Sequence, residues 1–308
     1  MQRSLTCVLS IIVSSLLPLV ANAQAFRAYV ASYGADTNPC TVAAPCRLLP
    51  AALNAIVNGG EVWMLDSANY NSATVTISKD ASIMAVPGQI GSIVAAGGSP
   101  AIVISPGFIV ALKNVSITNN ANNPGNDGIQ MTTGRLTVQD SVIAVVSNGI
   151  SVNGTAVISV HNSSFRGGFR GVFVQGGASA DISGSKLANV SYSLVAFAAG
   201  SAGTTTNMNI TGCAITGGVT GVISAGELSG ANVRVTVHDT TVANVSYGFL
   251  AGVDTGGTAV MSIANSAATL SGIGLYQYGG AVLESLGTNL VRSNGTNISG
   301  TVTPVSGS

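Results

Sequence analysis

Charged side chains that could do chemistry are scarce in this 308-residue chain. The densest group is the segment FRGGFRG, which carries Arg166 and Arg170. A guanidinium offers a planar fork of donors that suits an anionic or hydroxyl-rich ligand. Asp127 falls two repeats before Arg170, about 10 Å away at the usual strand spacing. A catalytic site would therefore rest on Arg166, Arg170 and Asp127, whereas the alternative for Arg170 is a structural role, stacked on Tyr192.

The two histidines complete no recognised site. His161 and His238 fall in the same column of repeats three coils apart, about 14 Å, so they cannot share a metal ion. His238 beside Asp239 and Arg234 could act in acid/base chemistry, but adjacent strand residues point to opposite faces, which favours a solvated surface. The loop NNANNPGND carries one carboxylate, too few for calcium. We predict no metal site and no cofactor, since phosphate, dinucleotide and zinc motifs are also missing from the sequence.

The composition excludes a nucleic-acid partner. Only 7% of residues are charged, against roughly a quarter in ordinary globular proteins, and the formal net charge is zero. Nucleic-acid binding needs a basic surface, which this chain lacks. Apolar residues make up 46% and glycine contributes 39 residues. The chain is therefore expected to be rich in sheet, with a polar but neutral surface.

Residues 1–23 have the pattern of a signal peptide. Arg3 precedes an apolar run that ends in Ala21-Asn22-Ala23, a small-x-small cleavage site, so the mature chain would begin at Gln24. The alternative is an uncleaved anchor, because the apolar run is long for a signal core. No later apolar run is long enough to cross a bilayer. We expect a secreted, periplasmic or cell-surface protein that leaves the membrane after cleavage.

Export makes disulfides feasible, and three cysteines remain in the mature chain. Cys40 and Cys46 flank the short loop TVAAP and are interpreted as a local disulfide, with two free thiols as the alternative. Cys213 lies inside a repeat and is expected to be a small buried apolar residue.

Residues 24–66 are predicted to form a capping region. A strand over Arg27 to Ser32 is followed by a helix that starts at Pro50, runs to Asn58 and ends at Gly59-Gly60. A second strand follows over Glu61 to Leu65. A lone helix before an all-β array would cover the apolar end of the stack.

The rest of the chain, from about residue 73 to 300, repeats one unit. A turn column can be aligned at Asp80, Asn114, Asp140, Asn162, Gly184, Gly212, Asp239 and Asn265. An apolar residue follows three positions later, and from the third coil a glycine or serine follows six positions after that. Coils of about 22 residues with three short strands predict a parallel β-helix, right-handed by the general crossover rule. A sandwich or propeller would need hairpin signals that are too few here. Residues 24–308 are therefore expected to form one all-β domain of eight to nine coils.

The chain resembles the right-handed parallel β-helix, or pectin-lyase-like, superfamily, and within it the uncharacterised secreted bacterial members. The likeness rests on the N-terminal cysteine loop, the capping helix and the segments GGEVWMLDSANY, TVTISKDASI and GTNLVRSNGT. It implies the fold. It is weak for function, because one scaffold hosts many activities and the site decides among them.

The strand that begins with the repeated glycine has an uncharged outward face. Lyases and hydrolases of the superfamily cluster charged residues on such a face, so its neutrality favours a non-catalytic protein. Its aromatic and amide residues could stack on sugar rings or dock a surface component. They are Phe173, Gln175, Phe197, Tyr276 and Tyr278. Three alternatives remain: loops that bury this face, a polysaccharide lyase or glycoside hydrolase, and a structural adhesion protein.

Overall fold

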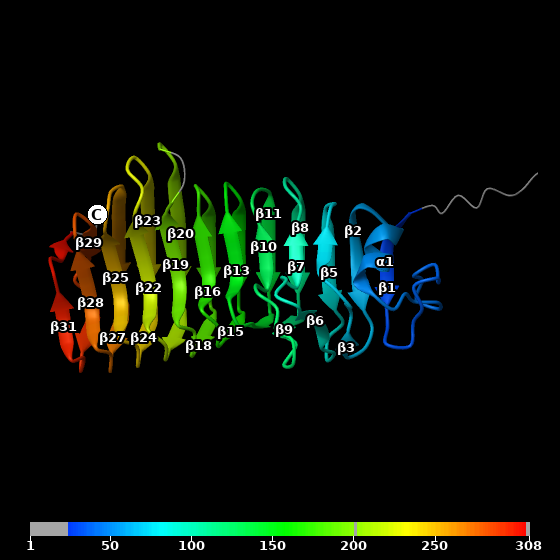
Figure 1. Ribbon diagram of the computed structural model, residues 1–308. Helices are drawn as coiled ribbons and strands as arrows, with labels where there is room; N and C mark the ends of the chain where they lie inside the picture. The colour runs from blue at the N-terminus through cyan, green and yellow to red at the C-terminus, as the bar shows by residue number, and fades with distance from the viewer. Residues whose placement is uncertain (1–23, 200–201, 306–308) are drawn as a thin grey trace, which may run out of the picture.

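The protein is a long stack of β-coils with its N-terminal end closed by a helix. The computed structural model describes residues 24–199 and 202–305 (Figure 1). The predicted signal peptide, residues 1–23, lies outside the described residues. The stack has about nine turns, which confirms the predicted all-β solenoid and its coil number.

Each complete coil contributes one strand to each of three parallel sheets, and sheet A has one additional strand at either end. Sheet A has 12 strands and contains β1 (Ala25–Val30), β2 (Ile56–Met64), β5 (Ala81–Ala85), β8 (Ile109–Lys113), β11 (Arg135–Gln139), β14 (Val157–His161), β17 (Ser179–Ser183), β20 (Thr205–Thr211), β23 (Asn232–His238), β26 (Thr258–Ala264), β29 (Val282–Ser285) and β32 (Thr303–Pro304). Sheet B has 10 strands and contains β3 (Ala68–Asn69), β6 (Gly91–Ala95), β9 (Val115–Asn119), β12 (Val142–Ala144), β15 (Ser164–Arg166), β18 (Lys186–Ala188), β21 (Ala214–Thr216), β24 (Thr241–Ala243), β27 (Ala267–Thr269) and β30 (Leu290–Arg292). Sheet C also has 10 and contains β4 (Val75–Ile77), β7 (Ile102–Ile104), β10 (Ile129–Met131), β13 (Asn148–Asn153), β16 (Arg170–Gln175), β19 (Tyr192–Ala198), β22 (Thr220–Gly226), β25 (Tyr247–Val253), β28 (Ile273–Tyr278) and β31 (Thr296–Ser299).

Alternation along each strand decides what lies inside the stack. In β11, Leu136 and Val138 are buried while Thr137 and Gln139 face outward, and Leu136 pairs directly with Ile158 of the next coil. The same register repeats from coil to coil, so columns of Val, Ile and Leu fill the interior. Each such buried side chain contributes roughly 1.5–3 kcal/mol relative to exposure. The hydrophobic columns therefore hold the stack together along its axis.

Two of the three corners have constant length and the third varies. The corner from sheet A to sheet B is the predicted turn column, and seven of its eight members have positive φ, between 46° and 63°. The prediction for the eighth, Asp80, is wrong: it lies between β4 of sheet C and β5 of sheet A, and its carboxylate accepts the Ile109 N–H at 2.8 Å. The matching turn of that coil falls instead between β5 and β6, with Gly88 at φ 84°. The first coil lacks the interval of six residues between the apolar residue and the glycine. Alignment on the type of the turn residue alone therefore places the turn of this coil at Asp80.

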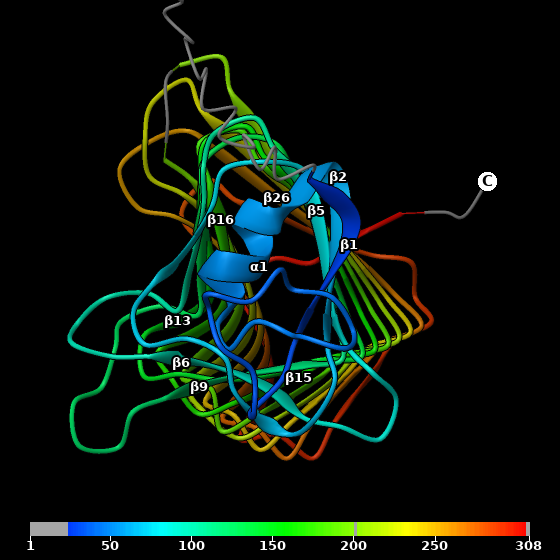
Figure 2. The same ribbon diagram turned by 90° about the vertical axis from the view of Figure 1, so that its right-hand side faces the viewer.

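The variable corner joins sheet C to sheet A. The loops that follow β22 and β25 project from one corner of the stack in the axial view (Figure 2). The corner from sheet B to sheet C has three residues in most coils, and the loop NNANNPGND lengthens it between β9 and β10. From the third coil onward, the two constant intervals of the sequence repeat therefore correspond to two corners of fixed length, and only the third corner varies.

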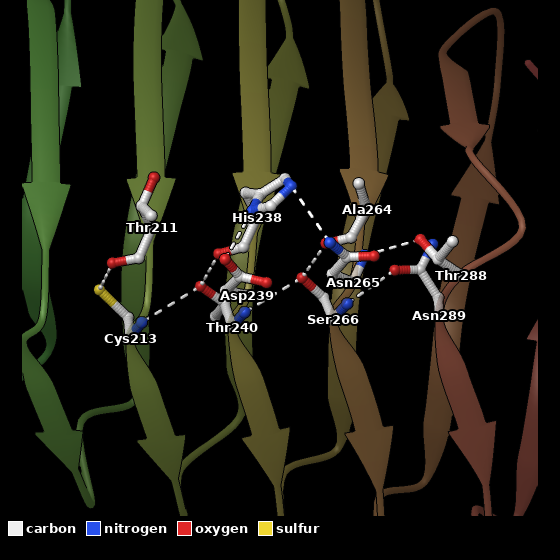
Figure 3. A network of polar contacts seen from close by, with 10 residues as sticks. All are labelled: Thr211, Cys213, His238, Asp239, Thr240, Ala264, Asn265, Ser266, Thr288 and Asn289. Carbon is white, nitrogen blue, oxygen red and sulfur yellow. Dashed lines mark hydrogen bonds and ion pairs between the residues drawn. The ribbon is translucent and has the colours of Figure 1, made fainter. Parts of the chain in front are cut away.

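A column of buried polar side chains runs beside the turn column. Each hydroxyl accepts a hydrogen bond from the backbone N–H of its counterpart one coil earlier and donates one to the carbonyl two residues before itself. For example, the Ser163 hydroxyl accepts from the Ser141 N–H at 3.2 Å and donates to the His161 carbonyl at 2.8 Å. The members of this hydroxyl ladder are Ser141, Ser163, Ser185, Cys213, Thr240, Ser266 and Asn289, the last through its amide oxygen. Figure 3 shows its C-terminal half.

Cys213 occupies a hydroxyl position in that ladder. It is buried and free, as predicted, but its sulfur does more than fill space, since it lies 3.6 Å from the Thr211 carbonyl oxygen. Burial raises the pKa of the Cys213 thiol, so the thiolate needed for reaction is disfavoured.

The N-terminal end is closed by a helix and a disulfide loop. Helix α1 (Leu49–Ala55) covers the core end with Leu49, Ala52 and Leu53 (Figure 2), but it is shorter than predicted. Strand β2 begins already at Ile56, so Gly59-Gly60 form a bulge opposite β1 rather than a helix end. The strands predicted on either side of the helix are present as β1 and β2.

The predicted disulfide is confirmed and has a structural role. Cys40 and Cys46 are bonded and buried, with their Cα atoms 4.6 Å apart. The Tyr29 N–H donates to the Cys40 carbonyl at 2.8 Å, and the Cys46 N–H donates to the Tyr29 carbonyl at 2.9 Å. The loop thus pairs with the free edge of β1, the kind of edge that otherwise invites association with another chain.

Candidate functional site

The candidate binding residues of the sequence analysis lie together on the outer face of sheet C. Two outward columns run along this sheet C face, one residue from each strand. The first contains Val103, Gln130, Ser151, Phe173, Val195, Ile223, Leu250 and Tyr276. The second begins at β13 and contains Asn153, Gln175, Phe197, Ala225, Gly252 and Tyr278. The face divides into a polar N-terminal half and an aromatic C-terminal half.

A glycine near the start of the strand makes close coil stacking feasible. A Cβ at Gly149 would lie 2.5 Å from the Gly171 carbonyl oxygen of the next coil, and one at Gly171 would lie 2.5 Å from that of Ser193. Ser193 is the exception in this column, and its hydroxyl is buried without a hydrogen-bond partner among the described residues. These close approaches hold successive strands in one register and therefore align the outward columns.

The aromatic half consists of two groups of half-buried rings. Phe173 and Phe197 lie 6.1 Å apart between ring centroids, on adjacent strands. Tyr276 stacks on Tyr247 at 5.3 Å and lies 5.4 Å from Tyr278. The rings are partly covered by one another, and each keeps part of its surface accessible.

Tyr278 ties the second aromatic group to the variable corner. Its hydroxyl donates to the Asp254 carboxylate at 3.3 Å, and its side chain lies over Gly252, where a Cβ would come within 2.6 Å of three Tyr278 atoms. Burial, reinforced by the charge of Asp254, raises the pKa of Tyr278 to about 12. Tyr278 is therefore neutral at physiological pH and presents a hydroxyl that is already bound to a carboxylate.

The polar half is hollowed. A depression of about 450 Å³ lies over β7, β10, β13 and β16, and Gln130, Thr132, Ser151, Asn153 and Gln175 are among its lining residues. These side chains provide amide and hydroxyl groups without charge. Because Gln175 pairs in register with Phe197 and lies beside Phe173 on the same strand, the depression continues directly into the first aromatic group.

Arg170 lies at the junction of the two halves and is held by aromatic rings. Its guanidinium carbon is 4.5 Å from the Phe169 ring centroid and 4.4 Å from that of Phe173. The prediction of Tyr192 as its stacking partner is wrong, since Tyr192 instead meets Phe169 edge-on at 5.1 Å. Burial between the rings lowers the pKa of Arg170, while the nearby Tyr192 and Asp127 oppose that shift. Arg170 has no ion pair among the described residues, so its remaining donors are available.

Asp127 and Arg166 are placed differently from Arg170. Asp127 is 3% exposed, and it accepts hydrogen bonds from the Asn148 backbone and side-chain nitrogens and from Gln130, at 2.9–3.0 Å. Its carboxylate therefore fixes the start of β13. Arg166 is exposed at the end of β15 in sheet B, where its Nε lies 3.4 Å from the Ser164 hydroxyl. Of the three residues proposed for catalysis, Asp127 lies near enough to Arg170 to affect its pKa, whereas Arg166 ends a strand of sheet B.

The histidine environment differs from the expected one. His238 Nδ1 lies 2.8 Å from an Asp239 carboxylate oxygen, although adjacent strand residues are expected to point apart. Asp239 has φ 51°, so it belongs to the turn and not to the strand, and the alternation ends there. Asn265 Nδ2 lies 3.4 Å from His238 Nε2 (Figure 3). About half of each side chain of the His238–Asp239 pair is exposed.

Within the described residues, no cluster of three or more metal-ligating side chains occurs. Over the same residues, no helix is long and apolar enough to span a membrane.

Comparisons with known proteins identify the fold. No protein-family model matches the sequence, and no curated protein matches it. Among solved structures, pectate lyase Pel9A superposes with a TM-score of 0.65, over 89% of this chain and 78% of the lyase, at 14% identity. XylC in complex with xylose superposes with a TM-score of 0.56, over 91% of this chain and 70% of its own, at 8% identity.

The chain therefore has a pectin-lyase-like, right-handed parallel β-helix fold, as the sequence predicted. Identities this low show the fold alone. The activity has to be argued from the residues on the faces.

Proposed function

We propose that this protein is an exported, non-catalytic β-helix protein that binds a carbohydrate along the sheet C face. The observation that carries the proposal is an uncharged depression with amide and hydroxyl groups that adjoins one group of accessible aromatic rings, with a second such group further along the same face. Amide and hydroxyl groups satisfy sugar hydroxyls, and the rings offer apolar platforms with a defined geometry. Phe173, Gln175, Phe197, Tyr276 and Tyr278 are the proposed contact residues.

The length of the face suits an extended polysaccharide rather than a single sugar. Phe173 and Tyr276 lie four strands apart in sheet C, about 19 Å at the usual strand spacing. A linear glycan lying along the axis would place successive rings over successive coils. The fold shared with pectate lyase Pel9A and with XylC, which was solved with xylose, supports a carbohydrate-related role. Export is supported by the Cys40–Cys46 disulfide.

Binding of insoluble and soluble polysaccharides by the mature chain tests the proposal. Phe173→Ala together with Tyr276→Ala should weaken binding at least tenfold in affinity electrophoresis or a pull-down on the polysaccharide. Ile109→Ala, exposed on the outer face of sheet A and outside both depressions, is the matched apolar control. Binding unchanged in the double variant would remove the sheet C face from consideration.

A polysaccharide lyase or glycoside hydrolase is the second candidate, favoured by the fold shared with a pectate lyase. It would use Arg166, Arg170 and Asp127. Incubation with polyuronates and neutral glycans, followed by measurement of unsaturated products and new reducing ends, tests it. Product formation that disappears in Arg170→Ala would favour the enzyme. A structural adhesion protein would instead self-associate through the aromatic face and bind no oligosaccharide.

A further inference from the structure

The outer face of sheet A has a depression of its own, on a different side of the stack. It measures about 400 Å³ and lies over β14, β17, β20 and β23. Its outward lining consists of two short rows of side chains in direct register. One row is Ser159, Asp181, Asn209 and Thr236, and the other begins with the exposed Val157 and continues with Ser179, Asn207 and Arg234.

The polar groups in this depression are not paired with one another. Asp181, Asn209 and Arg234 make no side-chain hydrogen bond or ion pair with any described residue. Elsewhere on the outer face of sheet A several polar groups are paired, among them Arg27 with Glu61 at 2.7 Å and Ser262 with Glu284 at 2.5 Å. The unpaired carboxylate, carboxamide and guanidinium of the depression are available to a ligand.

The arrangement has the chemistry for hydroxyl groups. Asp181 and Asn209 face each other across adjacent strands, about 4.8 Å apart at the backbone. A carboxylate only accepts hydrogen bonds, a carboxamide both donates and accepts, and each ligand hydroxyl can do both. Arg234 adds a fork of donors at the far end, one strand beyond Asn209. One carboxylate and one guanidinium leave the depression without net charge, so it does not select an anionic ligand.

We propose that this depression is a second saccharide site, which binds a neutral, hydroxyl-rich sugar unit through Asp181, Asn209 and Arg234. It does not depend on the proposed function of the sheet C face. No aromatic side chain lines the depression among the described residues, so the sugar is held by its hydroxyls and not by ring stacking. A protein with glycan sites on two faces would connect two glycan chains.

Saturation-transfer NMR on the mature chain with millimolar maltose, cellobiose, mannobiose and lactose tests this site, with trigalacturonate as the charged probe. Affinity for at least one neutral disaccharide should fall tenfold or more in Asp181→Asn and in Asn209→Ala. Thr137→Ala, in the same column but outside the depression, is the matched control and should bind normally. Phe173→Ala with Tyr276→Ala should leave this binding intact.

Three results would each overturn the proposal. They are the absence of binding by all four neutral disaccharides, binding that persists in both Asp181→Asn and Asn209→Ala, and binding that is lost only in the aromatic double variant. Tighter binding of trigalacturonate that disappears in Arg234→Gln would equally contradict a neutral ligand. Circular dichroism of each variant checks that the fold is retained.

Discussion

Removal of one hydroxyl from the buried ladder should destabilise the stack by more than any comparable surface change. Ser163→Ala leaves the Ser141 N–H without its acceptor, since the Ser163 hydroxyl lies 3.2 Å away and both residues are buried. The His161 carbonyl keeps a second donor, the Asp140 N–H at 3.2 Å, so the loss falls mainly on the Ser141 amide. A buried unsatisfied donor costs about 1–3 kcal/mol. We expect that range for the free energy of unfolding.

Ser159→Ala is the matched control, because Ser159 faces outward from the same coil and makes no side-chain hydrogen bond within the described chain. Its effect should stay within about 0.5 kcal/mol. Urea unfolding measures both variants, and amide hydrogen exchange at Ser141 reports the local effect in a stack whose coils need not unfold together. Equal stability of the two variants, or unchanged exchange at Ser141, would refute the role assigned to the ladder.

Three further predictions concern buried or partly buried polar groups. Cys213→Ser should raise the free energy of unfolding by up to about 1 kcal/mol, since a hydroxyl is a stronger hydrogen-bond donor and acceptor than a thiol. A serine variant that is less stable than Cys213→Ala would contradict this prediction. Ser193→Ala should also stabilise, by about 1 kcal/mol in urea unfolding, because it removes a buried hydroxyl that has no partner among the described residues; lower stability would show that the hydroxyl is satisfied. Burial raises the pKa of Tyr278 from its usual value near 10 to about 12 in the folded state. The contribution of this shift to the free energy of unfolding is therefore full below pH 10 and is lost as the pH rises through 12. Burial also raises the pKa of Tyr70, so ultraviolet titration should show two tyrosines that ionise late, and the amplitude of this late step should decrease in Tyr278→Phe.

The coil architecture was predictable because one physical requirement recurs in every coil. The sheet A to sheet B corner needs a left-handed residue, and Asn114, Asp140 and Gly184 meet that need with different side chains. The terminal coil obeys a different requirement, so Asp80 was misaligned. Helix α1 ends early for a related reason: pairing of β2 with β1 and β5 outweighs local helix propensity from Ile56 onward.

The columns of the candidate site were predictable, but the contacts within them were not. Register follows from the repeat, so the spacing of the repeat alone is enough to place Phe173 and Phe197 on adjacent strands. Ring stacking depends on rotamers that neighbouring coils decide jointly, and Tyr247 could have been found only from its place just before the repeated glycine. His238 and Asp239 show the opposite error, because strict alternation does not extend across a residue whose backbone is left-handed.

Arg170 shows how a corner residue changes the chemistry of a column. Phe169 lies in the three-residue corner, outside the alternating strand. Its ring and that of Phe173 both pack against the Arg170 guanidinium, so they fix its position and partly bury it. A cation that stacks on rings keeps its edge donors for a ligand while its faces are covered. That geometry suits recognition of sugar hydroxyls at the junction of the polar and aromatic halves. It does not suit proton transfer, because a guanidinium stays protonated and the nearest candidate carboxylate, Asp127, is already bound by Gln130 and Asn148.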